Sequence, residues 1–167
     1  IQAGAVVDLS GVEPVGISVS GTLLIDGVLS CGGANAVTIT GAWLNNSGPG
    51  GFLEGTSVVE FGGVSPTLPN VAETFHDITI SSSEDAVALA DYTVSGTWRS
   101  DTSSFLASTF TVTFSGPVFN PSQIDGSATT TFNDVVIDNG SNGLLYLDSG
   151  DTIRVDTLTV SDSGQQV

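Results

Sequence analysis

Four oxygen-bearing residues in the last third of the sequence could bind a calcium ion: Asp138, Asn142, Asp148 and Asp151. The stretch DNGSNG at 138–143 has oxygen ligands at alternate places and a glycine at position six, as a calcium-binding loop does. It lacks a ligand at position three, and position twelve is Ser149 instead of glutamate. We therefore expect these residues to be solvated turn residues and the protein to need no cofactor, with a calcium site at these four residues as the alternative.

The single histidine, His76, is flanked by Glu73 and Asp77 and could form a carboxylate–histidine pair. A hydrolytic triad also needs a nucleophile, and no nucleophile motif accompanies this histidine. A later copy of the same segment has Asn133 at the matching position, so we expect His76 to be a surface residue. Nothing in the sequence points to the two opposed carboxylates that a glycosidase uses. We predict that the protein is not an enzyme.

Trp43 and Trp98 occupy equivalent positions in two similar segments. If they were exposed on one face together with Tyr92 or Tyr146, they could stack on sugar rings. They recur in register with a series of phenylalanines, however, and this regularity favours a place in the core. We expect core residues, with glycan stacking as the alternative.

The chain is strongly acidic. Eighteen Asp and Glu residues face two arginines and no lysine, which gives a formal net charge of −16. Nucleic acids and anionic membrane surfaces are therefore not expected as partners, because both are bound through clustered cations. No run of about 18 apolar residues is present, so we expect no membrane insertion. The negative charge should make copies of the chain repel one another at low salt, and cations would relieve that repulsion.

Cysteine use and polar composition indicate the compartment. Cys31 is the only cysteine and cannot form an internal disulfide, so we expect it to be a small buried residue. Sparse cysteine with abundant Ser, Thr, Asn and Gly is typical of extracellular proteins, and we predict an extracellular or cell-surface location. Asn45 and Asn139 each begin an N-glycosylation sequon.

Hydrophobic and polar residues alternate along most of the chain. Segments such as AVTITGAW, TSVVEF and FTVTFSG follow period two and are rich in Val, Ile, Thr and Phe, as β-strands are. Clusters of Gly, Asn, Ser and Pro, such as NNSGPGG and GGVSPTLPN, separate them and predict turns. No stretch of ten residues has helical periodicity, so we predict an all-β protein.

The centres of these expected strands recur at a nearly constant spacing. The first four are 20, 20 and 21 residues apart, and the series continues less regularly; its members are Val19, Ile39, Val59, Ile80, Val94, Val112, Val136 and Val155. This spacing predicts a β-solenoid with roughly 20-residue coils, eight coils and a rod about 40 Å long. A β-sandwich of repeated modules is the alternative fold.

A longer repeat of about 55 residues overlies the coils. FLEGTSVVEFGG at 52–63 matches FLASTFTVTFSG at 105–116, and TFHDITI at 74–80 matches TFNDVVI at 131–137. A Gly-x-Trp sequence opens each copy. We therefore interpret residues 1–167 as a single repeat array; its parts are a partial repeat at 1–40, repeats at 41–95 and 96–160, and a tail at 161–167.

These segments resemble the tandem β-rich repeats of large secreted bacterial surface and adhesin-like proteins. The shared pattern is Gly-x-Trp, then Phe, then Val-x-Phe-x-Gly, then Phe-x-x-[Leu/Ile/Val]-x-Ile, and it covers most of residues 18–160. The second copy departs from it at TWRSDTSSF, which lacks the Asn-Asn turn of the first copy. The resemblance implies a β-rich stalk in an adhesin or a surface layer.

The ends of such an array suggest its function. A solenoid buries each coil only against its neighbours, so end coils expose apolar residues and strand edges unless they are capped. Neither AVVDL at 5–9 nor TLTVSDSGQQV at 157–167 has the composition of a cap. We predict an extracellular structural protein, such as a stalk, filament subunit or surface-layer element, whose partner is a second copy bound head to tail or by strand addition. The alternative is a carbohydrate-binding or adhesive module with glycans as partners.

Overall fold

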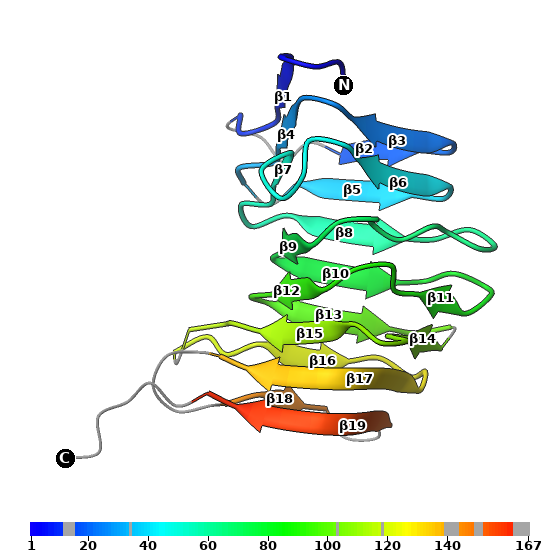
Figure 1. Cartoon of the computed structure of the whole chain (residues 1–167), viewed down its shortest axis with the longest axis vertical. Helices are drawn as coiled ribbons and strands as arrows, with labels where there is room; N and C mark the ends of the chain where they lie inside the picture. The colour runs from blue at the N-terminus through cyan, green and yellow to red at the C-terminus, as the bar shows by residue number, and fades with distance from the viewer. Residues whose placement is uncertain are drawn as a thin grey trace.

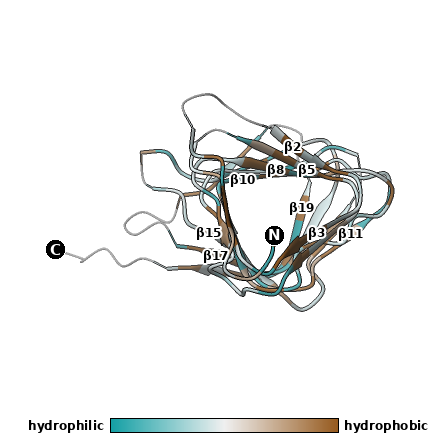
Figure 2. Ribbon diagram, turned by 90° about the horizontal axis from the view of Figure 1, so that it is seen from above, coloured by the Kyte–Doolittle hydropathy of each residue, from teal (hydrophilic) through white to brown (hydrophobic). Residues whose placement is uncertain are grey.

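The computed structural model describes residues 1–11, 16–33, 35–102, 104–117, 119–138, 144–148 and 152–161. Within these ranges the chain forms nineteen strands and no helix, and so none that could cross a membrane. The strands wind around one axis as a parallel β-solenoid (Figure 1), and the view along the axis shows three sides (Figure 2). The all-β solenoid is confirmed, and the sandwich alternative is wrong.

Each turn of the chain passes through three faces in the same order. Face one is a seven-stranded parallel sheet that consists of β2 (Gly16–Val19), β5 (Ala36–Ile39), β8 (Val58–Phe61), β10 (Asp77–Ile80), β13 (Thr97–Ser100), β16 (Gln123–Asp125) and β18 (Tyr146–Leu147). Face two contains β3 (Thr22–Ile25), β6 (Ala42–Asn45), β11 (Ala86–Val87), β14 (Phe105–Leu106) and the first parts of β17 (Thr130–Ile137) and β19 (Ile153–Val160).

Face three completes each turn. Its strands are β1 (Val6–Asp8), β4 (Val28–Ser30), β7 (Phe52–Leu53), β9 (Glu73–Phe75), β12 (Tyr92–Val94), β15 (Thr111–Phe114) and the second parts of β17 and β19. Side chains alternate between the interior and the solvent along the strands, as period two requires. In β15, for example, Val112 and Phe114 are buried while Thr111 and Thr113 are only partly so.

The register of face one measures the coil length. Residues in the same inward position on consecutive turns are Ile17, Val37, Val59, Ile78, Trp98, Ile124 and Leu147. Six steps therefore cover 130 residues, or about 22 residues per coil. Seven strands spaced about 4.8 Å apart give a rod roughly 34 Å long.

The expectation of eight coils is wrong, because the eight marker residues do not lie on one face. Val19, Ile39, Val59 and Ile80 belong to face one, whereas Val94 and Val112 belong to face three. The 14-residue step from Ile80 to Val94 is thus a passage between two faces and not a short coil. Period two identifies a strand, but it does not say on which side of the solenoid that strand lies.

The 55-residue repeat is out of phase with the coil. Trp43 lies on β6 in face two, and Trp98, its counterpart, lies on β13 in face one. Phe61 on β8 in face one likewise corresponds to Phe114 on β15 in face three. Each copy is therefore displaced by one face, since equivalent strands are eight faces apart along the chain and three faces make one turn.

Two aromatic clusters fill the interior, one per copy of the repeat. The N-terminal aromatic cluster consists of Trp43, Phe52, Phe61, Phe75 and Tyr92, and the C-terminal aromatic cluster consists of Trp98, Phe105, Phe114 and Phe132. Their geometry repeats: the tryptophan meets the first phenylalanine edge-on, with ring centroids 4.9 Å apart in one cluster and 4.4 Å in the other. The two clusters are thus packed in the same way, although the second copy of the repeat is displaced by one face.

The glycine of each Gly-x-Trp sequence allows this close stacking. A Cβ atom on Gly41 would lie 2.2 Å from the Gly21 carbonyl oxygen of the preceding coil. A Cβ atom on Gly96 would lie 2.3 Å from Asp77 Oδ1 and 2.9 Å from the His76 carbonyl oxygen. Both positions therefore need glycine because neighbouring coils approach too closely for a side chain.

Candidate functional site

The last described coil leaves its inward residues open to solvent. β18 and β19 are paired on one side only, with β16 and β17. Leu147, Leu158 and Val160 continue the inward columns of Ile124, Val135 and Ile137, yet they are 52%, 58% and 51% exposed. An apolar cavity of about 220 Å³ opens beside them, between Val135, Leu145, Ile153 and Val155. This surface, here called the open end, has the apolar character of a coil–coil contact and is covered by no further described coil.

The opposite end is partly covered by the first residues of the chain. The Ile1 ammonium group donates to the Leu24 carbonyl oxygen at 2.7 Å, and the Asp26 amide donates to the Ile1 carbonyl oxygen at 2.8 Å. Ile25 beneath them is completely buried. Val7, however, is 37% exposed, and Ile17 and Val19 are only partly buried. The first coil therefore also presents strand edges and apolar side chains, but fewer than the open end.

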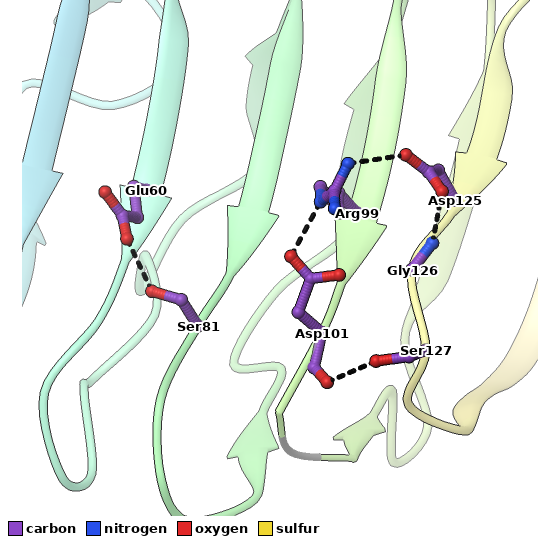
Figure 3. A network of polar contacts seen from close by, with 7 residues as sticks. All are labelled: Glu60, Ser81, Arg99, Asp101, Asp125, Gly126 and Ser127. Atoms are coloured by element: carbon purple, nitrogen blue, oxygen red, sulfur yellow. Dashed lines mark hydrogen bonds and ion pairs between the residues drawn. The ribbon is translucent and has the colours of Figure 1, made fainter.

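A polar network on the outer surface joins neighbouring coils (Figure 3). Arg99 Nε donates to Asp101 Oδ2 at 2.6 Å, and its Nη1 donates to Asp125 Oδ2, one coil further on, at 2.8 Å. On the same face Ser81 Oγ donates to Glu60 Oε1 at 2.6 Å. Such half-exposed ion pairs add little stability each. Each of these carboxylates accepts a hydrogen bond from a side chain on the same face. The contacts between neighbouring coils help to fix their register.

The structure places Trp43 and Trp98 in the core. Both side chains are completely buried in the two aromatic clusters, and Tyr92 is buried as well, with its hydroxyl donating to the Pro69 carbonyl oxygen at 2.8 Å. Of the four aromatic residues considered for sugar stacking, Tyr146 is the exposed one, at 53%. Stacking needs an accessible ring face, so the two tryptophans do not offer a sugar-binding surface.

This burial leads to a direct prediction for fluorescence. We expect the emission of Trp43 and Trp98 to be unchanged when a panel of soluble oligosaccharides is added, because no sugar can reach either ring. Titration of the purified chain, with free tryptophan as the control for inner-filter effects, measures this. A saturable change in emission would contradict the prediction and point to a glycan site that alters the core.

The calcium residues are not brought together where the structure describes them. Asp138 and Asp148 are exposed, and their amides donate to the carbonyl oxygens of Phe114 and Ile124. Asn142 and Asp151 lie outside the described residues. Within the described ranges no three His, Cys, Asp or Glu side chains are close enough together to hold a metal ion.

The three residues that the sequence allowed as a carboxylate–histidine group point to different partners. His76 Nδ1 lies 3.1 Å from Ser95 Oγ, and Asp77 Oδ1 accepts from the Thr97 amide at 2.6 Å. Glu73 points into the core, where its Oε1 accepts from Asn45 Nδ2 at 2.6 Å. His76 therefore has no carboxylate partner in this group, and Asp77 connects two coils.

The sequence pointed to Glu73 only as a neighbour of His76, and its burial in the core was not predicted. It is 4% exposed, and burial raises its pKa to about 7, although the Asn45 amide and the Trp43 indole favour the ionised form. A repulsive contribution from Glu54 adds to the rise. The signal was present in the alternation, because Glu73 precedes the buried Phe75 by two residues and must share its face.

Asn45 and Cys31 are both fully buried. The Asn45 amide group donates to the Gly48 carbonyl oxygen and to Glu73, so the first sequon is closed to glycans. Asn139, which begins the second sequon, lies outside the described residues. The expectation that Cys31 is buried is confirmed, and burial raises the pKa of its thiol.

Comparison with known proteins adds no relative from which to transfer a function. No family model, no curated protein and no solved structure matches this chain. The class that the fold defines is a three-sided parallel β-solenoid, and the functional argument depends on its own surfaces.

Proposed function

We propose that the protein is a non-enzymatic, extracellular structural element, such as a stalk, filament subunit or surface-layer component, that assembles through its open β ends. The observation that carries this proposal is the exposure of Leu147, Leu158 and Val160, which continue inward core columns. An apolar patch of this kind on a polar, highly charged molecule marks a contact surface. The extracellular location is supported by composition alone.

The partner that fits the open end is the first coil of a second copy. All strand pairs in the solenoid are parallel, so β18 and β19 can continue their ladders only with strands that run in the same direction if the fold is to extend. β1, β2 and β3 provide such edges at the other end. A head-to-tail contact joins two different surfaces and therefore propagates into a filament. Strand addition by β1 is the less favourable form, because β1 is already paired with β4.

Charge should control this assembly. The net charge of −16 makes two copies repel each other, and added salt or divalent cations screen that repulsion. Filaments should therefore form more readily at high ionic strength or in the presence of calcium, without a specific calcium site.

Electron microscopy of the purified chain, with and without millimolar calcium, tests the proposal. We expect filaments with a subunit rise near the rod length, roughly 34 Å. A monodisperse monomer at high protein and salt concentration would refute end-to-end assembly of this chain.

A pair of matched substitutions locates the contact. Leu158→Asp puts a charge on the open end and should abolish filaments, because the charge would be buried without a partner. Leu53→Asp makes the same change at a lateral position that is 48% exposed and should leave filaments intact. Equal effects of the two substitutions would show that assembly does not use the open end.

A further inference from the structure

Glu73 is the one carboxylic acid with a buried side chain among the described residues. Its Oε1 accepts the hydrogen bond from Asn45, but its Oε2 has no hydrogen-bond partner in the part of the chain that the structure describes. The Trp43 indole N–H, which is close enough to favour the ionised form of Glu73, also makes no hydrogen bond of normal geometry with the described residues. A buried polar atom without a partner is costly, and the cost is much larger when the group carries a charge.

No cation among the described residues offsets a negative charge at this position. Glu54 and Asp91 are the charged groups whose electrostatic influence reaches Glu73 or its neighbour Tyr92, and both are acids. The Tyr92 hydroxyl is engaged with the Pro69 carbonyl oxygen. Asn45 and Trp43 on β6 are neutral. Arg99 is paired with Asp101 and Asp125, and Arg154 lies on β19 in the last coil. An ionised Glu73 would therefore be held in the core by two neutral groups, the Asn45 amide and the Trp43 indole, and by no cation among the described residues.

The segment that precedes Glu73 is held less regularly than the strands. Between β8 and β9 the chain crosses face two without a strand, and a single bridge, Ala42 to Thr67, joins it to the preceding coil. At its start, backbone hydrogen bonds join Gly62 to the preceding coil and Gly63 and Val64 to the following coil. Further on, Leu68 is completely buried, the Pro69 carbonyl receives the Tyr92 hydroxyl, and Asn70 Oδ1 accepts from the Asn45 amide at 2.9 Å. Residues 62–72 thus form the face-two wall of this coil, and in residues 65–72 the backbone of Thr67 alone bonds to the preceding coil, so few ladder hydrogen bonds need to break there.

The second copy of the repeat provides an internal reference. Thr130 occupies the position that matches Glu73, two residues before Phe132, and it is buried and neutral. The C-terminal aromatic cluster is therefore built in the same way but has no ionisable group at this position.

We propose that Glu73 is a pH-sensitive latch: as a neutral acid it keeps residues 62–72 closed over the N-terminal aromatic cluster, and as a carboxylate it opens that segment to water. Opening relieves the buried charge by hydration and leaves the C-terminal aromatic cluster closed. In the solenoid, the coil that contains residues 62–72 then opens to water as the pH rises through neutrality. This inference does not depend on end-to-end assembly.

Fluorine NMR of the full chain labelled with 5-fluorotryptophan tests the latch without any change in sequence. The two indoles report the two clusters, and Trp43→Phe and Trp98→Phe assign the signals. With a pKa of about 7, Glu73 is about 1% ionised at pH 5 and about 99% ionised at pH 9. We expect the Trp43 signal to move between these pH values and the Trp98 signal to stay in place.

Three substitutions identify the titrating group. Glu73→Gln and Glu73→Thr, the latter copying Thr130, should each abolish the movement of the Trp43 signal. His76→Asn, which copies Asn133, should leave it intact and controls for the one histidine, a residue type that changes charge in this range. Movement that survives both Glu73 substitutions, movement of both tryptophans together, or no movement at all would overturn the proposal.

Discussion

Replacing Phe132 with alanine is expected to cost about 3–5 kcal/mol of unfolding free energy. Phe132 is completely buried at the centre of the C-terminal aromatic cluster, with ring centroids 5.4 Å from Trp98, 5.7 Å from Phe105 and 5.8 Å from Phe114. Its removal would delete these edge and tilted contacts and leave a cavity between two coils that cannot collapse, because the backbone ladders fix their separation. Urea unfolding followed by circular dichroism measures the change.

A matched pair of variants makes this prediction specific. Phe75 occupies the equivalent place in the N-terminal aromatic cluster, so Phe75→Ala should cost a similar amount. Phe119 is fully exposed, and Phe119→Ala should change stability by less than about 0.5 kcal/mol. If Phe119→Ala proved as costly as Phe132→Ala, the aromatic clusters would not be the source of stability.

Glu73→Gln is expected to make the protein more stable at pH 8.5 and to leave its stability almost unchanged at pH 4. The pKa of Glu73 is about 7 in the folded chain, against an ordinary value of 4.5. Below about pH 4.5 the acid is neutral in both states. As the pH rises from there to about 7, the unfolded chain loses its proton first, so folding stability falls; above this range the loss is complete.

The size of that loss follows from the shift, which corresponds to about 3 kcal/mol for a group that is almost entirely buried. Glutamine keeps the shape and stays neutral, so Glu73→Gln should not lose this stability as the pH rises. Urea unfolding of both proteins at several pH values measures the difference. Parallel stability curves, with no divergence between pH 4 and pH 8.5, would show that Glu73 is hydrated in the folded chain.

Local chemistry determined the strands and turns of this protein. Alternation of Val, Ile, Thr and Phe with polar residues marks strands wherever it occurs, and Gly, Asn, Ser and Pro mark the corners. Period two also placed Trp43 and Trp98 with the phenylalanines in the core, because inward positions repeat at every second residue. These features depend on near neighbours in the chain, so they can be predicted from the sequence alone.

The face to which each strand belongs was decided only by the tertiary structure. The corners between strands differ in length. Paired residues on neighbouring strands of face one are therefore between 19 and 26 residues apart in the sequence. Val94 therefore follows Ile80 in the series of strand centres along the sequence, although it lies on another face. The prediction of eight coils was wrong for this reason. The displacement of the repeat by one face could not be predicted from the sequence either.

The candidate site depended on the tertiary structure in the same way. Glu73 could be assigned to the inward side of its strand from Phe75, but its burial without a cation depends on Asn45 and Trp43 of the preceding coil and on residues 62–72. The open end arises because Leu158 and Val160 lie where no further described coil covers them. Alternation determines which side chains point inward; the stacking of distant coils decides what each of them meets there.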